Sequence, residues 1–91
     1  MLQTISITVD GLVQGVFYRQ STKAKAIELG VTGEIKNKSD GTVYIIAAGT
    51  EAQLKQFIEW CHKGPEMAIV TKVKVEQIPL QSFKGFSIVK N

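Results

Sequence analysis

The chain has 91 residues, of which 44% are hydrophobic and 21% are charged. This is the composition of one globular domain, and it excludes a disordered protein and a membrane-spanning one, since no apolar run approaches the roughly 18 residues that a membrane helix needs. The net charge of +3 argues only weakly for nucleic-acid binding, because the lysines are scattered from Lys23 to Lys90 and form no patch.

The first ten residues, MLQTISITVD, lack the basic start and the long apolar segment of a secretory signal. The single cysteine, Cys61, cannot form an internal disulfide and suits a reducing compartment. We therefore expect a cytoplasmic protein that does not bind membranes.

Residues 3–10 alternate, with Ile5, Ile7 and Val9 on one face, and predict a half-buried strand. A loop follows over residues 11–18. The next segment predicts a helix that begins near residues 19–22, with Ser21 or Thr22 helping to satisfy its first amides, and that ends at Gly30.

Residues 31–37 and 42–48 predict two strands, joined by a turn whose Asp40-Gly41 pair is a hairpin signal. Thr50 opens a second helix, because Gln53 stands at the capping-box spacing. The apolar stripe of this helix consists of Leu54, Phe57, Ile58 and Cys61, and the pair Gly64-Pro65 ends it.

Residues 69–78 alternate as a further strand, with Ile69, Thr71, Val73 and Val75 expected on one side. Residues 83–90 supply a short last strand with Phe86 and Ile88 inward. The order strand, helix, strand, strand, helix, strand predicts an α+β, ferredoxin-like (βαββαβ) sandwich, an antiparallel sheet with two helices on one face. Residues 1–91 then form one domain, which we expect to be a monomer.

Several kinds of chemistry lack the residues they need. The only histidine, His62, neighbours Cys61 on a predicted helix, where adjacent residues do not share a face, so a Cys–His dyad is disfavoured. One histidine and one cysteine also fall short of a metal site. We therefore expect no metal.

The loop over residues 11–18 is a candidate anion site. A loop that leads from a strand into a helix presents unpaired backbone N–H groups and the positive end of the helix dipole. Gly11 and Gly15 allow close approach of the backbone, and Arg19, the only arginine, adds a planar fork that matches phosphate oxygens. A tight connection with a surface arginine would show the same pattern, and Asn37 taken alone is typical of turn geometry.

Two segments together resemble the acylphosphatase signature. They are GLVQGVFYR at residues 11–19 and LGVTGEIKNKSDGTV at residues 29–43, and weaker similarity continues through Gly64-Pro65 to the closing FSIV. Glu34 stands where many members carry an aromatic residue, and Tyr18 where phenylalanine is common. Along a strand, Glu34 and Asn37 should point to opposite faces.

The resemblance implies a small enzyme that hydrolyses the carboxyl–phosphate anhydride of acyl phosphates without a metal, a cofactor or a covalent intermediate. Arg19 and Asn37 are then the catalytic residues, with Arg19 on the phosphate and Asn37 on the attacking water, and Thr42 supports Asn37. The phosphate-binding loop consists of Gln14, Gly15, Val16, Phe17, Tyr18 and Arg19.

Two alternatives share the predicted fold. A ferredoxin-like nucleic-acid-binding module would stack bases on exposed strand aromatics, but Tyr44 is the sole mid-strand candidate on the central hairpin. A catalytically idle domain could keep an anion pocket alone, although such a domain would be expected to have lost Arg19 or Asn37.

Overall fold

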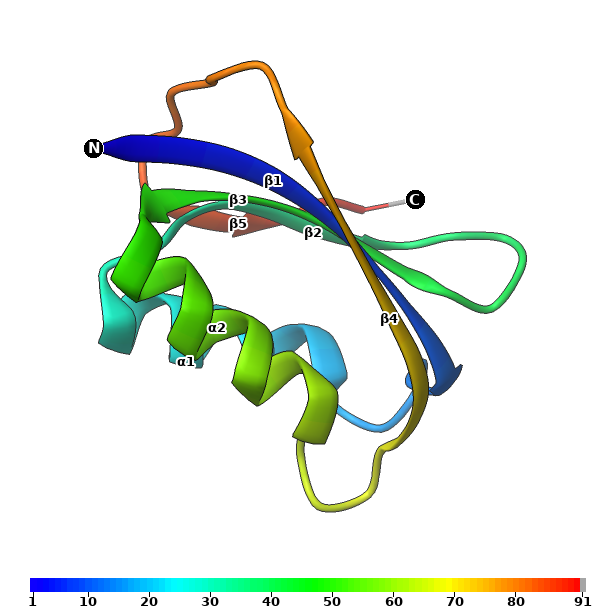
Figure 1. Ribbon diagram of the computed structural model, residues 1–91. Coiled ribbons are helices and arrows are strands. Elements are labelled where there is room, and N and C mark those ends of the chain that lie inside the picture. Colours follow the sequence, from blue (N-terminus) through cyan, green and yellow to red (C-terminus); the bar gives the residue numbers. More distant parts are fainter. Residues whose placement is uncertain (91) are drawn as a thin grey trace.

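The computed structural model of the protein describes residues 1–90, which form a single sheet with two helices (Figure 1). The elements in chain order are β1 (Leu2–Leu12), α1 (Tyr18–Leu29), β2 (Thr32–Asn37), β3 (Val43–Thr50), α2 (Glu51–Lys63), β4 (Ile69–Ile78) and β5 (Phe86–Ile88).

The sheet has the strand order β4-β1-β3-β2-β5. The pairs β1–β3, β1–β4 and β2–β3 are antiparallel, whereas β5 pairs with β2 in parallel. Both helices cover the same face of the sheet (Figure 1). The predicted ferredoxin-like α+β fold is therefore confirmed, and β5 adds one parallel edge to the four antiparallel strands.

The core lies between the helices and the sheet. Along β1 and β3, residues that face the helices alternate with residues that face away, as the period-2 pattern predicts. The apolar stripe of α2 packs against the residues that face the helices. None of the described helices is long and apolar enough to cross a membrane. The buried residues that form the core cluster are Ile5, Ile7, Val9, Val13, Tyr18, Ala26, Val31, Ile35, Val43, Ile45, Ala47, Leu54, Phe57, Cys61 and Phe86.

Helix α2 has the boundaries and the cap that the sequence predicts. The Thr50 side chain accepts a hydrogen bond from the Gln53 N–H, and the Gln53 side chain accepts one from the Thr50 N–H, which completes the capping box. Gly64 ends the helix with a positive φ of 67°, and its N–H donates to the Trp60 carbonyl. Leu54, Phe57 and Cys61 are buried, as expected of the apolar stripe.

The prediction that Ile69 and Thr71 share one side of β4 with Val73 is wrong. The β1–β4 register shifts between Asp10 and Gly11, which leaves Thr71 as an extra residue in β4. Val70 consequently packs against the core beyond the bulge, and Ile69 and Thr71 are exposed. Gly11 lies opposite the bulge, where a Cβ atom would collide with the backbone of β4.

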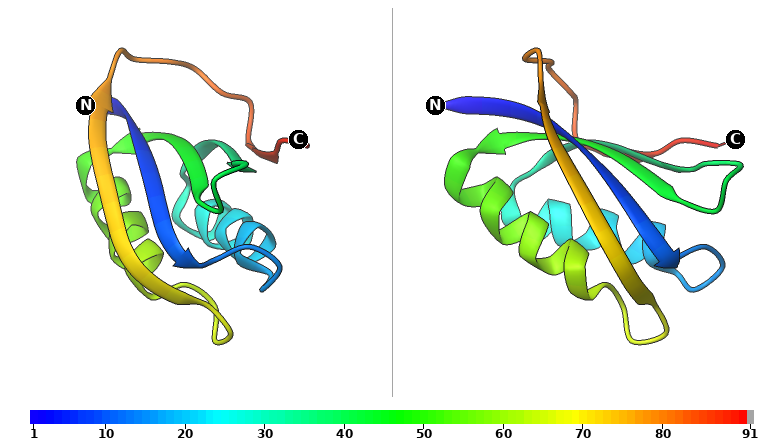
Figure 2. Two further views of the ribbon diagram at one scale, coloured as in Figure 1. Left: turned by 90° about the vertical axis from the view of Figure 1, so that its right-hand side faces the viewer. Right: turned by 45° about the vertical axis from the view of Figure 1, so that its right-hand side comes forward.

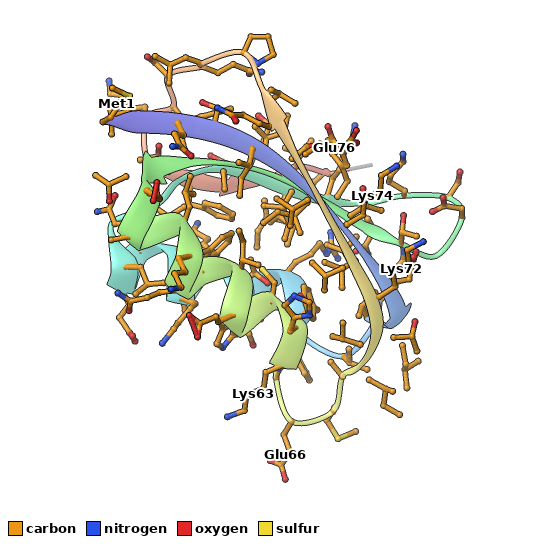
Figure 3. The ribbon with its side chains drawn as sticks, in the orientation of Figure 1. Met1, Lys63, Glu66, Lys72, Lys74 and Glu76 are labelled. Atoms are coloured by element: carbon orange, nitrogen blue, oxygen red, sulfur yellow. The ribbon has the colours of Figure 1, made fainter. Side chains whose placement is uncertain are left out.

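Strand β4 is the exposed edge of the sheet and carries charges along its length. Figure 3 shows Lys72, Lys74 and Glu76 projecting along this strand. Charged side chains on an edge strand discourage its pairing with a strand of another molecule.

Candidate active site

The segments that carry the predicted site meet at one end of the molecule. Strands β1 and β2 are both antiparallel to β3 and therefore run in the same direction, so their carboxyl ends lie at the same edge. The loop after β1 and the turn after β2 consequently lie on the same side of the molecule (Figure 2). The N-terminus of α1 follows directly from that loop.

Helix α1 begins without a side-chain cap. Its N-cap is Phe17, and the predicted caps are wrong: the Ser21 N–H donates to the Phe17 carbonyl (3.0 Å), and Thr22 Oγ1 donates to the Tyr18 carbonyl (2.7 Å). The first turn carries no acidic side chain. The positive end of the helix dipole is therefore left available to an external anion.

The loop backbone has an unusual shape. Phe17 has a φ of 62° and is the only non-glycine residue with a positive φ within residues 1–90. That conformation costs about 1–2 kcal/mol, and the Phe17 side chain is 72% exposed, so its own burial does not offset the cost. Gly15 has a φ of 74°. A Cβ atom placed on Gly15 would meet no other atom within 4 Å, so the backbone of Gly15 borders open space. Strain at such a place is typical of a functional loop.

A hollow of about 600 Å³ opens in front of this loop. Arg19, in the first turn of α1, lines it. Within residues 1–90 the one ion pair joins Lys25 to Glu28 at 2.8 Å, so no carboxylate in this range neutralises the guanidinium. The residues that line the hollow are Val13, Gly15, Phe17, Tyr18, Arg19, Gln20, Ile88 and Lys90. Four of the six predicted loop residues are among them.

Asn37 is the last residue of β2 and does not itself line the hollow. Strand alternation puts it on the same face as the buried Ile35 and puts Glu34 on the other face, as expected. Its Oδ1 atom is buried. Ile35 pairs in parallel with Ile88, so Asn37 and Lys90, each two residues further on, advance toward the same end of the molecule.

Thr42 stabilises the turn that follows Asn37. Its N–H and its Oγ1 both donate to Asp40 Oδ1, at 3.0 and 2.6 Å. These hydrogen bonds, the side-chain one foremost, hold the pKa of the Asp40 carboxyl below its usual value. The Thr42 carbonyl accepts from the Lys38 N–H at 2.9 Å and closes the hairpin. Thr42 thus holds the shape of the turn that begins one residue after Asn37.

The side chain of Gln14 reaches this turn rather than the hollow. Its Nε2 donates to the Lys38 carbonyl (2.8 Å) and to the Thr42 carbonyl (2.9 Å). The sequence pattern includes Gln14 in the phosphate-binding loop but gives no signal for these contacts, whose partners lie 24 and 28 residues along the chain.

Tyr18 fixes the other end of the loop. Its side chain is 1% exposed, its hydroxyl donates to the Cys61 carbonyl (2.8 Å), and its ring lies 5.7 Å from that of Trp60. Burial raises the pKa of the Tyr18 hydroxyl far above its usual value. Tyr18 therefore contributes its backbone to the loop and its side chain to the core.

The remaining candidates for covalent or metal chemistry are structural. Cys61 is buried, which raises the pKa of its thiol to about 12, whereas the neighbouring His62 is exposed. The predicted separation of the two side chains is confirmed. Across residues 1–90, no three His, Cys, Asp or Glu side chains gather closely enough to hold a metal ion.

The sequence model of the acylphosphatase family matches residues 5–88 of this chain. The chain belongs to the acylphosphatase family. The acylphosphatase of Marinobacter nauticus is 51% identical over 81 residues, which is 88% of each protein. Two solved acylphosphatases superpose with a TM-score of 0.93: that of Coxiella burnetii, at 39% identity over 97% of this chain and 93% of its own, and that of Bacillus subtilis, at 38% over 98% and 99%.

The match to the acylphosphatases includes the loop, the first turn of α1 and the β2–β3 turn, because residues 11–19 and 29–43 both lie inside the matched range. These are the segments that the fold brings to one end of the sheet.

Proposed function

We propose that this protein hydrolyses small acyl phosphates to a carboxylate and inorganic phosphate, with Arg19 and Asn37 as its catalytic residues. The observation that carries the proposal is the hollow at the uncapped N-terminus of α1, lined by Gly15 and Arg19, in a chain of the acylphosphatase family. Arg19 is the one arginine of the chain, and no carboxylate within residues 1–90 competes for it.

The phosphoryl group binds at the loop. Backbone N–H groups between Gly15 and Arg19, together with the positive end of the α1 dipole, take its oxygens, and the Arg19 guanidinium adds a two-pronged contact. Each charge-assisted hydrogen bond is worth about 1.5–3 kcal/mol. The same contacts stabilise the charge that the phosphoryl oxygens carry in the transition state.

Asn37 directs the nucleophile. Its carboxamide hydrogen-bonds a water molecule and aligns it for in-line attack at phosphorus. The new P–O bond forms as the bond from phosphorus to the carboxyl oxygen breaks. The departing carboxylate, whose conjugate acid has a pKa of about 4, needs no proton. The attacking water transfers one proton to a phosphoryl oxygen, which yields the carboxylate and dihydrogen phosphate.

This scheme needs neither a metal nor a covalent intermediate. Positioning and charge stabilisation suffice for phosphoryl transfer to water from so good a leaving group. We further propose that the enzyme acts as a cytoplasmic monomer. Its single free and buried cysteine supports a reducing compartment, and the cover that its own two helices give to one face of the sheet supports a monomer.

Hydrolysis of benzoyl phosphate by the purified chain tests the function. In Asn37→Ala, kcat should fall about 100-fold or more because the water loses its alignment, while the inhibition constant of inorganic phosphate should stay near the wild-type value. Equal loss of turnover and of phosphate binding, in a variant that is still folded, would contradict the role given to Asn37.

Arg19→Lys tests the phosphate-binding part of the scheme separately from the role of Asn37. It keeps the charge but loses the forked contact, so kcat/KM should fall about 10- to 100-fold and phosphate inhibition should weaken. The exposed His62→Gln variant is the matched control and should keep full activity, and EDTA should not reduce the wild-type rate. Near-native kinetics of Arg19→Lys would contradict the phosphate cradle.

A further inference from the structure

The Gln14 side chain joins the two halves of the candidate site. The anion-binding half begins at Gly15, one residue after Gln14, and the water-binding half ends at Asn37, one residue before Lys38. The Gln14 Nε2 group lies between them and donates both of its hydrogens, to the Lys38 carbonyl at 2.8 Å and to the Thr42 carbonyl at 2.9 Å.

Both acceptors are carbonyls of the turn itself. The Lys38 carbonyl also accepts from the Gly41 N–H (3.1 Å), and the Thr42 carbonyl also accepts from the Lys38 N–H (2.9 Å). Each therefore uses one lone pair inside the turn and the other on Gln14. The turn has its own hydrogen bonds in addition to those from Gln14. The Gln14 carboxamide therefore fixes the position of the loop relative to a turn that is already hydrogen-bonded.

The sheet does not supply this link. The β1–β3 ladder ends at the pair Val9↔Val43, and beyond it β1 pairs only with β4. The loop after Leu12 leaves β1, which β3 separates from β2, while Asn37 lies at the end of β2. Two hydrogen bonds from the Gln14 side chain tie the loop to the turn beyond the end of the ladder.

We propose that Gln14 is a positioning residue for the hydrolysis: it holds the anion-binding loop at a fixed separation from Asn37, so that the bound water lies in line with the bound phosphorus. This inference rests on the proposed function. Gln14 acts through the Asn37 turn and through the loop backbone, not by contact of its side chain with the substrate. A displacement of about 1 Å between reacting groups can lower a rate about 100-fold, so a link of this kind is expected to show in kcat.

The chemistry of the contact distinguishes glutamine from its nearest substitutes. Gln14→Met keeps the length of the side chain but donates no hydrogen bond. Gln14→Glu keeps the shape but places a carboxylate against two carbonyl oxygens, which repel it and favour its protonated form. Once protonated, that carboxyl regains one O–H donor.

The test compares these variants with Gln53→Met, which makes the same substitution in the α2 cap, outside the lining of the hollow, and removes the hydrogen bond that the Gln53 carboxamide accepts from the Thr50 N–H. For Gln14→Met we expect kcat with benzoyl phosphate to fall about 10- to 100-fold. The inhibition constant of inorganic phosphate should change less than about three-fold, since the loop and Arg19 remain. Gln53→Met should lower the melting temperature to a similar extent and leave kcat within about two-fold of wild type.

The pH profile adds a readout that a purely structural role would not move. The activity of Gln14→Glu relative to wild type should rise between pH 7 and pH 5, as its carboxyl gains a proton, whereas the ratio for Gln14→Met should stay constant. Unchanged kcat in Gln14→Met, or a loss no larger than that of Gln53→Met at equal stability, would overturn the positioning role alone. Absence of turnover by the wild-type chain would overturn the proposed function, and the positioning role with it.

Discussion

The hydroxyl of Tyr18 offers a quantitative test of how the loop is anchored. Tyr18→Phe removes one oxygen atom and leaves the ring that packs on Trp60. The carbonyl of Cys61 belongs to the last turn of α2, where carbonyls lack helical partners. The N–H that would serve it is that of residue 65, which is Pro65 and has none. The Tyr18 hydroxyl, at 2.8 Å, satisfies this carbonyl in the interior.

The expected magnitude follows from the burial of this pair. Tyr18 is 1% exposed, and Cys61 is fully buried, so the substitution leaves a buried acceptor without its donor. Such a loss costs about 1–3 kcal/mol. In a domain of this length, each kcal/mol lowers the melting temperature by about 4–8 °C, so Tyr18→Phe should melt about 4–24 °C below wild type.

Thermal unfolding followed by circular dichroism measures the effect, and Tyr44→Phe, in a half-exposed tyrosine on β3, is the matched control. We expect the control to melt within about 4 °C of wild type, since surface substitutions usually change stability by less than about 0.5 kcal/mol. A Tyr18→Phe protein that melts with the control would refute the reasoning, because the Cys61 carbonyl would then need no partner from the loop.

Two further predictions concern specificity and pH. Asparagine tolerates the left-handed backbone, so Phe17→Asn removes the aromatic ring and keeps the shape of the loop. KM should rise several-fold for benzoyl phosphate and stay unchanged for acetyl phosphate, because Phe17 lines the hollow and only the aromatic acyl group can pack on its ring. Equal changes in the two KM values would contradict this contact. Burial raises the pKa of Cys61 from 9.0 to about 12, so the folded chain keeps a proton that the unfolded chain loses, and the free energy of unfolding should fall as pH rises above 9. Denaturant titrations between pH 9 and 10 should show this slope, at most about 1.4 kcal/mol per pH unit, reduced in Cys61→Ala; identical slopes would contradict it.

Elements defined by neighbouring residues could be predicted from the sequence. The capping box of α2 depends on Thr50 and Gln53, three residues apart, and the central hairpin depends on the Asp40-Gly41 pair. In both cases the signal and the structure it produces lie within one turn of the chain. Such elements therefore form from local interactions and need no particular tertiary contact to define their ends.

The direction of β5 and the bulge in β4 could not be predicted. β5 has three residues, and its direction depends on the connection from β4, which is held where the Gln81 N–H donates to Thr4 Oγ1, 77 residues away. The alternation expected along β4 assumes an unbroken ladder, and the extra residue Thr71 violates that assumption. Gly11 is the residue of β1 that lies opposite the bulge. The need for glycine there cannot be predicted from its neighbours, because it arises from contact with a strand that begins 58 residues later.

The candidate site divides in the same way. The chemistry of Arg19 and the glycine-containing loop is visible in one short segment, and the motif adds Asn37. The sequence does not indicate the uncapped start of α1 at Phe17, because serine and threonine near a helix start ordinarily suggest a cap. The contacts of Gln14 and Tyr18 join segments that meet only in the folded chain.

The strained conformation of Phe17 is tolerable because the loop is anchored on both sides. Val13 and Tyr18 are each 1% exposed, and burying side chains of this kind contributes about 1.5–3 kcal/mol apiece, which exceeds the 1–2 kcal/mol that a left-handed non-glycine residue costs. Between these anchors the chain has too few residues to relax, so the backbone at Gly15 and Phe17 must turn toward the hollow. Relief of the strain would require the core to release Val13 or Tyr18. The folded chain therefore holds the loop in this shape by itself, so binding of the proposed phosphate would carry little cost of ordering the loop.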